Sequence, residues 1–273
     1  MRRKKTSWVT TLLLIFGSLF ILFPLYLTIT IAFKTPQEMA GNLLSLPRSW
    51  SFVNFTEAIE MTNFFNALKN STIVTVVVVF FTVLTNSLVA YAVARNLHKK
   101  LYKALYYYFL SAMFIPFPII MLPLVKQTSS WGMDNLWGLI ILYIVFNLSF
   151  NIFIYIGYIK SIPLELEEAA IMDGAGTWGV FWKVIFPLLA PMNATVAILT
   201  CLGAWNDFML PLVLLSDRDM ATLPLVQYVF QSQFSTDYNL AFASYLLALA
   251  PMIIVYVFAQ KWIISGVMKG SIK

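Results

Sequence analysis

Charged side chains are scarce in this sequence of 273 residues. Asp, Glu, Lys and Arg together make up 11% of it, whereas they make up about 25% of a typical soluble domain. Hydrophobic residues account for 60%, against about 45–50% in such a domain. The composition therefore excludes an ordinary soluble globular domain. It also excludes a disordered chain, because disorder requires low hydrophobicity.

Cysteine and histidine are almost absent, with one residue of each type, Cys201 and His98. A single cysteine excludes a disulfide framework and any cysteine-based metal site. A single histidine beside two lysines counts against mechanisms that need a histidine cluster. We therefore predict no metal site.

Long apolar runs account for the high hydrophobicity. Six of them lie at about 8–33, 71–94, 104–125, 137–159, 188–215 and 240–264. A helix needs about 17–25 apolar residues to cross the hydrocarbon core of a bilayer, and longer runs are accommodated by tilt. Because backbone groups in hydrocarbon must be paired within the segment, such runs form helices. We predict an all-α polytopic membrane protein, with one transmembrane domain of six spans over residues 1–273.

The positions of the basic residues predict the orientation of these spans. Five of the eighteen basic residues fall on one side of the predicted spans, namely Lys34, Arg48, Lys69, Lys126 and Arg218. The other thirteen fall on the side of both termini. Because basic residues are retained in the cytoplasm, both termini are predicted to be cytoplasmic. The net charge of +6 is then an orientation signal, and we expect lipid, not nucleic acid, around the chain. The first run is too long for a cleaved signal peptide, so we expect a retained span.

The longest predicted cytoplasmic loop, residues 160–187, contains signals for two short helices. Ser161 is a candidate N-cap, and Asp173-Gly174 is predicted to end the first helix, with Gly174 in a left-handed conformation. Thr177 is a candidate cap for a second helix, and Pro187 is predicted to open the fifth span. Ala169 and Ala170 form a small, flat face, and Glu168 offers a charge to a cationic partner. From the residues alone, this loop is either a simple interfacial connection or a docking surface.

The spacing within this loop resembles a known family. Glu168-Ala169-Ala170, then Gly174, then Pro187 resembles the EAA loop of binding-protein-dependent ABC importer permeases. The Asp173-Gly174-Ala175 variant is similar to the carbohydrate-importing branch, the family of the maltose permease subunits. Val184 and Phe186 depart from the family pattern but remain apolar. Three further segments resemble this branch: 204–208 (AWNDF), 222–224 (TLP) and 266–270 (GVMKG). The smaller maltose-type subunit is the closer match.

The resemblance implies a role for each part. The EAA helix would dock in a cleft of a cytoplasmic ATPase, with Glu168 paired to a basic residue there and Gly174 in the turn. The chain would form half of a pore with a second permease subunit in the bacterial plasma (inner) membrane. An extracellular or periplasmic sugar-binding protein would deliver the substrate. ATP and Mg would be used by a separate pair of ABC ATPases, and no phosphate-binding G-x-x-x-x-G-K-[ST] motif occurs in this chain. We therefore expect a transport subunit that is not an enzyme, with no catalytic residues and no bound cofactor.

Polar residues inside the predicted spans are candidates for the substrate path. Asp207 is the one acid well inside a predicted span, and an ionisable group there is costly and often functional. Trp205, Asn206 and Asp207 together offer a stacking face, an amide and a carboxylate for sugar binding. The alternative is that Asp207 hydrogen-bonds a neighbouring helix or lies near the external interface. For Asn86, Asn147, Asn151 and Asn193, interhelical hydrogen bonds are the favoured role.

A second class of function is an ion-coupled secondary transporter or channel with Asp207 in the path. Such proteins use paired intramembrane charges or inverted repeats. The sequence offers one intramembrane acid and no evident repeat. An intramembrane hydrolase would need a second aspartate or a histidine in the membrane. These comparisons favour the importer permease.

Overall fold

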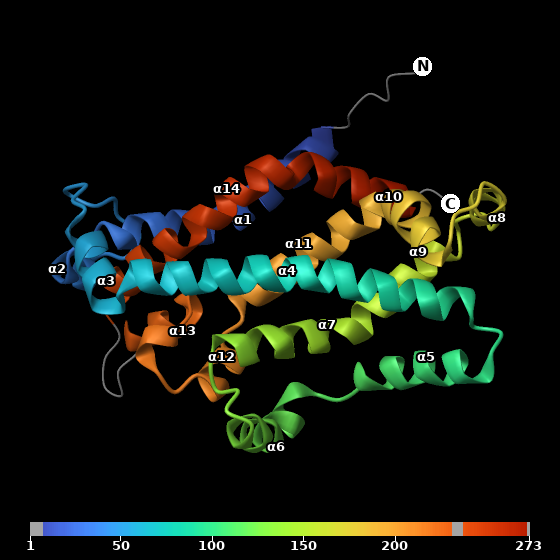
Figure 1. The fold of residues 1–273 in the computed structure, drawn as a ribbon. Coiled ribbons are helices and arrows are strands. Elements are labelled where there is room, and N and C mark those ends of the chain that lie inside the picture. Colours follow the sequence, from blue (N-terminus) through green and yellow to red (C-terminus); the bar gives the residue numbers. More distant parts are fainter. Residues whose placement is uncertain (1–7, 231–236, 272–273) are drawn as a thin grey trace. The chain divides into compact units, whose positions relative to one another are not determined.

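The computed structural model describes the backbone of residues 8–230 and 237–271, and the side chains of residues 8–230 and 237–260. Over this part of the chain the structure is helical and contains no strand (Figure 1). The helices are, in chain order: α1 Trp8–Ala32, α2 Pro36–Gly41, α3 Val53–Thr62, α4 Phe64–Arg95, α5 Lys100–Ala112, α6 Phe117–Ser130, α7 Leu136–Ile159, α8 Glu165–Met172, α9 Thr177–Val180, η1 Phe181–Ile185, α10 Phe186–Leu188, α11 Ala190–Asn206, α12 Met209–Leu214, η2 Arg218–Met220, α13 Leu223–Gln227, η3 Tyr228–Phe230 and α14 Tyr238–Ser271.

In the described part of the chain, four helices are long and apolar enough to cross a membrane alone: α1, α4, α7 and α14, the last over Tyr238–Gln260. Two further pairs are long and apolar enough only when taken together. They are α5 with α6, bent by 102°, and Thr177–Leu188 with α11, bent by 74°. If each bent pair is one span, the chain has six, the number expected from the sequence. The signature of the tail, residues 266–270, lies outside the described side chains.

The third predicted span is not one helix over 104–125. α5 ends at Ala112 and α6 begins at Phe117, so the chain bends between them. Pro116 is extended, with φ −64° and ψ 133°. Because proline lacks an N–H group and disfavours helical geometry in the residue before it, Pro116 and Pro118 interrupt the helix. The predicted run at 104–125 is therefore two helices with a sharp bend at its prolines.

The fifth predicted span, 188–215, also differs from a single helix. α11 runs from Ala190 to Asn206, Asp207 is extended with φ −74° and ψ 129°, and α12 then starts at Met209. Pro211 has no N–H group to donate to the carbonyl of Asp207, so a continuous helix across this point would leave that acceptor unpaired. Pro187 does not open α11, because it lies in α10, before the bend at Leu189.

The contacts divide the chain into two compact units, which are described separately. Unit 1 comprises residues 1–65 and 226–254, and unit 2 comprises residues 66–225 and 255–273. In unit 1 the core is formed by Ala32, Ala58, Phe230 and residues 240–243 of α14. The most apolar stretch of α1 contains no buried residue within the structure. The single transmembrane domain over 1–273 stays a prediction.

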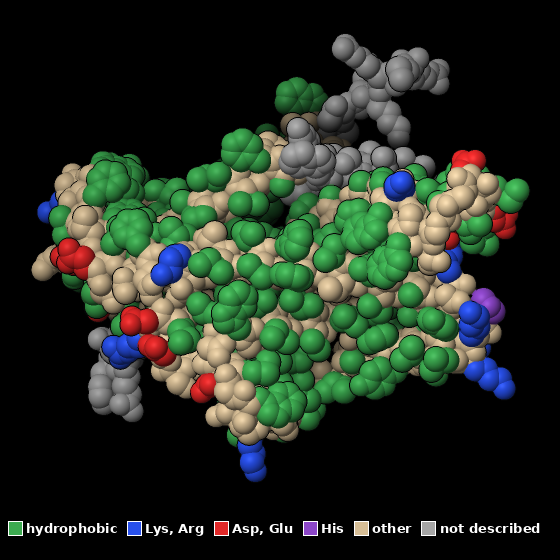
Figure 2. Space-filling view, viewed as in Figure 1, with side chains coloured by type: hydrophobic (Ala, Val, Ile, Leu, Met, Phe, Trp, Pro, Cys, Tyr) green, Lys and Arg blue, Asp and Glu red, His purple; other side chains and the backbone are tan. Residues whose placement is uncertain are grey.

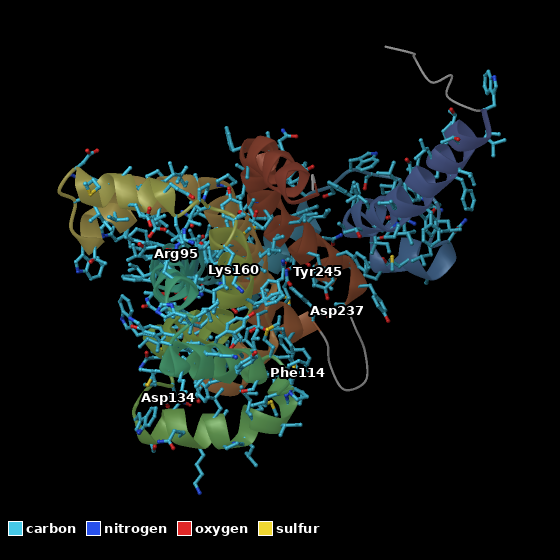
Figure 3. The ribbon with its side chains drawn as sticks, turned by 90° about the vertical axis from the view of Figure 1, so that its right-hand side faces the viewer. Arg95, Phe114, Asp134, Lys160, Asp237 and Tyr245 are labelled. Atoms are coloured by element: carbon cyan, nitrogen blue, oxygen red, sulfur yellow. The ribbon has the colours of Figure 1, made fainter. Side chains whose placement is uncertain are left out.

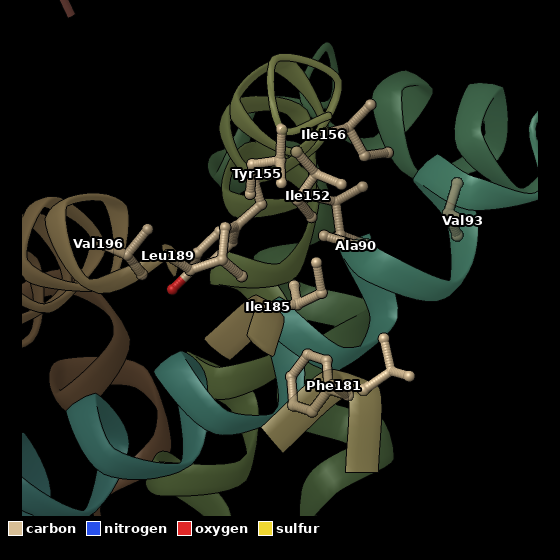
Figure 4. Packing of buried hydrophobic residues seen from close by; sticks show 12 residues of the cluster. Ala90, Val93, Ile152, Tyr155, Ile156, Phe181, Ile185, Leu189 and Val196 are labelled. Carbon is tan, nitrogen blue, oxygen red and sulfur yellow. The ribbon is translucent and has the colours of Figure 1, made fainter. Parts of the chain in front are cut away.

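Unit 2 is built around α4 and α7, whose apolar faces pack at two levels. At one level, Ala90 and Val93 of α4 meet residues 152–156 of α7, together with Phe181 and Ile185 (Figure 4). At the other level, Val74 and Val78 join Leu139, Tyr143 and residues 210–215. Hydrophobic side chains dominate the viewed surface over α4, α5 and α7 (Figure 2). Such a surface fits hydrocarbon, because lipid replaces water as the neighbour of these side chains.

Candidate coupling site

The loop at 160–187 begins with a turn and then α8. Three acids, Glu165, Glu167 and Glu168, lie in the first turn of α8, where the helix dipole favours negative charge. Ser161 does not cap this helix, because its hydroxyl donates to the carbonyl oxygen of Tyr158 at 2.7 Å. Ser161 instead stabilises the end of α7. The N-cap position is Leu164, which forms no side-chain cap.

Gly174 ends α8 as the sequence predicts. Its φ is +86°, in the left-handed region. The N–H of Gly174 donates to the carbonyl of Ile171, and the N–H of Ala175 donates to that of Ala170, both at 2.9 Å. This pair of bonds is the Schellman motif, in which a left-handed residue reverses the chain after a helix. The prediction for Gly174 is confirmed.

The returning arm of the loop is continuous but not a simple α-helix. It consists of α9, the π-helical turn η1 and α10. Gly176, not Thr177, occupies the N-cap, and no side chain caps α9. Phe181 and Ile185 of η1 are buried in the core of unit 2 (Figure 4). The arm therefore fixes the loop to α4 and α7 through apolar packing.

One face of this loop is exposed. Glu168, Ala169, Asp173 and Gly174 are exposed, while Ala170 is half-buried and packs against the core. Large apolar side chains flank them on the surface: Leu166, Ile171, Met172 and Trp178. An exposed apolar patch with a charge beside it is typical of an interaction surface. Among the described residues, those that the sequence analysis assigned to docking are exposed, apart from Ala170.

Glu167, which the sequence analysis did not single out, faces inward and is 7% exposed. The guanidinium of Arg95 donates to one of its carboxylate oxygens at 2.6 Å, and the hydroxyl of Tyr91 donates to the other at 2.6 Å. Arg95 also donates to the carbonyl of Ile162 at 3.1 Å. Figure 3 views this end of unit 2 and labels Arg95. In the sequence, Arg95 at the end of a predicted span indicates orientation, and nothing in the sequence indicates that it pairs with Glu167.

The predicted group Trp205, Asn206 and Asp207 does not form one polar face. Trp205 is buried, and the amide of Asn206, an exposed residue, donates back to Leu202 in its own helix at 2.9 Å. Asp207 accepts hydrogen bonds from the hydroxyl of Tyr143 at 2.9 Å and from the N–H of Met209 at 3.0 Å. Asp207 thus bridges α7 and the break before α12. A role for the three residues in the substrate path stays a prediction.

The four asparagines in the spans differ in their bonding. Asn193 of α11 accepts a hydrogen bond from the hydroxyl of Tyr155 of α7 at 2.8 Å, which confirms an interhelical bond. Asn147 donates within α7 itself. The side-chain nitrogens of Asn86 and Asn151 are buried and have no hydrogen-bond partner in the described part of the chain. The interhelical role is therefore established for one of the four.

The segment after α1 in unit 1 is held by Glu38 in α2. Its carboxylate accepts hydrogen bonds from the backbone N–H groups of Thr35 and Arg48, each at 2.8 Å. These two bonds lower the pKa of Glu38 below its usual value.

The buried ammonium of Lys34 donates to the carbonyls of Asn42 and Leu43 at 2.8 Å. The segment encloses a hollow of about 700 Å³ lined mostly by polar residues: Thr35, Gln37, Glu38, Gly41, Asn42, Ser45, Leu46, Arg48 and Ser49. In the described residues, no three His, Cys, Asp or Glu side chains gather to hold a metal ion.

Fold and site together define a multi-span membrane protein. The loop at 160–187 forms a helical bracket, which is exposed at one end of the packed span helices. Comparisons with known proteins identify the family. Residues 86–269 match the model of the binding-protein-dependent transport system inner membrane component. The chain belongs to this family of ABC importer permeases.

Relatives of known description match over nearly their whole length. The multiple sugar-binding transport system permease protein MsmG of Streptococcus mutans is 39% identical, with 96% of this chain and 95% of that protein covered. The probable starch degradation products transport system permease protein AmyC of Thermoanaerobacterium thermosulfurigenes is 34% identical, with coverage of 98% and 97%. The melibiose/raffinose/stachyose import permease protein MelC of Bacillus subtilis is 32% identical, with coverage of 99% and 98%.

A solved structure shares the fold. It is a chain of a bacterial ABC transporter involved in the import of the acidic polysaccharide alginate, with a TM-score of 0.81 and 24% sequence identity. The match covers 93% of this chain and 94% of that chain. The all-helical importer-permease architecture is therefore established for this chain.

Proposed function

We propose that this chain imports a di- or oligosaccharide as one half of a pore formed with a second permease subunit. The observation that carries the proposal is the exposed bracket at 160–187, whose Glu168, Ala169 and Asp173 are free to meet a partner. Three relatives with names that specify sugar or starch-product transport support a carbohydrate substrate. An ion-coupled transporter or channel is not favoured, because the chain belongs to an ABC importer family.

The partners follow from the family and from the surface. A cytoplasmic pair of ABC ATPases would bind α8 and the turn at Gly174, and would use ATP and Mg. A sugar-binding protein outside the membrane would deliver the substrate. The chain itself would be a transport subunit without enzymatic activity or a bound cofactor. It would lie in the bacterial plasma (inner) membrane with both termini in the cytoplasm, so that the basic turn between α4 and α5 (Figure 2) faces the cytoplasm.

The coupling cycle would be a shift between two populations. ATP-driven closure of the ATPases would draw α8 inward and favour a pore that is open to the outside. Because a ligand shifts an equilibrium only by its differential affinity for the two states, the ATP-bound ATPase dimer must bind α8 more tightly in the outward-open state. The three-residue group at the end of α11, Trp205, Asn206 and Asp207, would contribute to the path.

Reversal of the charge at Glu168 tests this proposal. The complex is assembled from this chain, its partner permease, the ATPases and the binding protein, and is reconstituted in liposomes. We expect Glu168→Arg to reach the membrane but to lose ATPase binding or ATP-driven uptake of labelled oligosaccharide by tenfold or more. Glu165→Arg is the matched control, because Glu165 is an exposed acid on the same turn of α8. Gly174→Asp is expected to behave like Glu168→Arg.

Two outcomes would contradict the proposal. ATPase binding and uptake that are unchanged in Glu168→Arg would remove α8 from the coupling surface. Uptake that persists without the ATPases and collapses when the ion gradient is dissipated would support the ion-coupled alternative. A binding protein titrated against a panel of sugars would then identify the substrate.

A further inference from the structure

α4 is fastened at both of its ends to loops of unit 2. Its inner end meets α8, and its outer end meets the segment 217–223. Both connections are made by polar side chains of α4, within unit 2. The contacts at the two ends lie about 25 residues apart along one helix. At a rise of about 1.5 Å per residue, they are separated by roughly 40 Å.

At the inner end, the contacts are charged and buried. Arg95 and Tyr91 of α4 each donate to Glu167 of α8 at 2.6 Å. Arg95 and the carboxylate side chain are 15% and 9% exposed. Hydrogen bonds in which the donor or the acceptor is ionised are stronger than neutral ones. The bonds from Arg95 and Tyr91 hold the inner face of α8, while Glu168 on the same helix is exposed.

At the outer end, the contacts are amide and hydroxyl hydrogen bonds. Asn70 donates to the carbonyls of Asp219 and Ala221 at 2.8 and 3.0 Å. Asn66 donates to the carbonyl of Asp219 at 2.7 Å. The hydroxyl of Ser71 accepts from the N–H of Leu223 at 2.8 Å. Asn70 and Ser71 are each 3% exposed, so these bonds are shielded from solvent.

Between these contacts α4 is a continuous helix without a built-in hinge. It spans Phe64–Arg95 and contains neither glycine nor proline. The other three helices of span length each contain one or both: α1 has Pro24, α7 has Gly138 and Gly157, and α14 has Pro251. Sharp kinks in helices arise at proline, at glycine pairs or at bulges. Figure 1 shows α4 as one unbroken helix, which can therefore move as one body.

We infer that α4 is a strut that links the coupling helix α8 to the external segment 217–223, with Glu167 and Arg95 as positioning residues. The inference rests on the proposed function and deepens it, because it says how movement at the ATPase side reaches the other face. A rigid element with fixed contacts at both ends is a physical route for coupling between distant sites. Since coupling is reciprocal, a partner bound at 217–223 would change the affinity of α8 for the ATPase by the same factor.

The first test removes the charge at the inner contact. We expect Glu167→Gln to retain assembly with the ATPases and basal ATP hydrolysis within twofold. Stimulation of ATP hydrolysis by the sugar-loaded binding protein, and sugar uptake, should fall tenfold or more. Glu165→Gln, an exposed acid on the same helix, should leave all four quantities within twofold. Unchanged stimulation in Glu167→Gln, or loss of ATPase assembly, would overturn the inference.

The second test asks whether the two ends act as one unit. Asn70→Ala should lower stimulation by the binding protein, while Lys69→Ala, the exposed neighbour, should not. Effects at well-separated, independent sites combine by multiplication of their fold-changes. If α4 transmits movement between its ends, stimulation in the double variant Glu167→Gln/Asn70→Ala should lie within twofold of that in the more impaired single variant. Multiplied losses would overturn the strut.

The third test changes the stiffness of α4 and not its ends. Phe80 is exposed near the middle of the helix. Phe80→Gly removes the ring and loosens the backbone, whereas Phe80→Ala removes the same ring and keeps a good helix former. We expect uncoupling in Phe80→Gly, with stimulation at least fivefold lower than in Phe80→Ala. Equal stimulation in the two variants would overturn the inference.

A measurement without transport separates this inference from the proposed function. Hydrogen exchange of the amides at 217–223 is followed in the purified complex. Glu167→Gln should accelerate that exchange threefold or more, although it lies at the other end of α4, and Glu165→Gln should not. Identical exchange in both would overturn the strut. Failure of ATP-driven sugar uptake in the unchanged complex would instead contradict the proposed function, while the exchange result still decides the strut.

Discussion

At the scale of single residues, the turn after α8 depends on backbone conformation and not on side-chain contacts. Gly174 adopts φ +86°, and a Cβ atom added there would meet nothing within 4 Å. A substitution at this position therefore costs the energy of the left-handed conformation alone. That cost is about 1–2 kcal/mol for most residues and is smaller for asparagine.

Gly174→Ala should loosen this turn, because alanine disfavours the left-handed conformation. We expect the amide of Ala175 to exchange hydrogen about 5–30-fold faster, the equivalent of about 1–2 kcal/mol. Gly174→Asn is the control and should fall between the variant and the unchanged chain. Equal exchange in all three proteins would show that α8 does not end in a Schellman turn.

The carboxylate of Glu38 gives the segment after α1 a dependence on pH. Two backbone N–H groups, those of Thr35 and Arg48, hold the pKa of Glu38 below its ordinary value of 4.5. Because the pKa is lower in the folded chain, the stabilisation is complete above the ordinary value and is lost as pH falls through the lowered one. Pepsin cleavage of residues 36–50 should therefore increase as the medium is acidified below that value. Glu38→Gln should remove this pH dependence, and a pH dependence that survives in Glu38→Gln would assign it to another group.

At the scale of elements, the breaks in the spans have local causes. α11 ends one residue before Asp207, whose carboxylate accepts from Tyr143 of α7 and from the N–H of Met209. The carboxylate thus pairs a free N–H group in the first turn of α12 and connects the break between α11 and α12 to α7. Polar contacts between membrane helices contribute about 0.6 kcal/mol on average, with a maximum of about 1.7.

Tyr143→Phe removes the α7 contact while it keeps the ring in the core. We expect it to lower the free energy of unfolding by about 0.6–1.7 kcal/mol, measured by denaturant unfolding in detergent. Asp207→Asn keeps one acceptor oxygen, which can serve the N–H of Met209, and its amide N–H can donate to the hydroxyl of Tyr143, so this variant should cost less. Sugar uptake should survive Asp207→Asn within a few-fold. Abolished uptake with normal stability would instead place the carboxylate in the transport path.

The long apolar runs were sufficient to locate the span helices but not the exact positions of their breaks. Runs at 8–33 and 137–159 correspond closely to α1 and α7, because an apolar run of that length has one stable form in a bilayer. The runs at 104–125 and 188–215 also look continuous in hydropathy. There the prolines decide, and whether a proline kinks a helix or ends it depends on what pairs the freed carbonyls.

The candidate site was predictable where backbone conformation is local and unpredictable where it depends on packing. The left-handed turn at Gly174 follows from the Asp-Gly pair at the end of a short helix. The choice between Glu167 and Glu168 does not follow from sequence, because adjacent helical residues point about 100° apart. Only the approach of α4 shows that Glu167 is the buried acid. Ser161 is a further example, because its hydroxyl donates to the carbonyl of Tyr158 at the end of α7 and does not cap α8.

At the scale of the whole molecule, the positions of the basic residues predict which way the chain lies in the membrane. Within the described residues, Lys99 precedes α5, Lys100 and Lys103 lie in its first turn, and α8 begins shortly after Lys160. Unit 2 packs the inner end of α4 against α8. The basic turn and the coupling loop therefore belong to the same side. The basic residues at 2–5 and at 261–273 lie outside the described side chains.

This arrangement predicts the side from which each loop can be labelled. Cys201 is first replaced by serine, and one cysteine is introduced at Ser45 or at His98. An impermeant maleimide applied to intact cells should label Ser45→Cys, because the segment after α1 would be external. It should label His98→Cys only after permeabilisation, since basic turns are retained in the cytoplasm. The opposite pattern would invert the orientation, place the bracket at 160–187 outside, and so leave it out of reach of any cytoplasmic ATPase. Equal labelling of both positions in intact cells would show leaky cells, and is controlled for by a cytoplasmic reporter thiol.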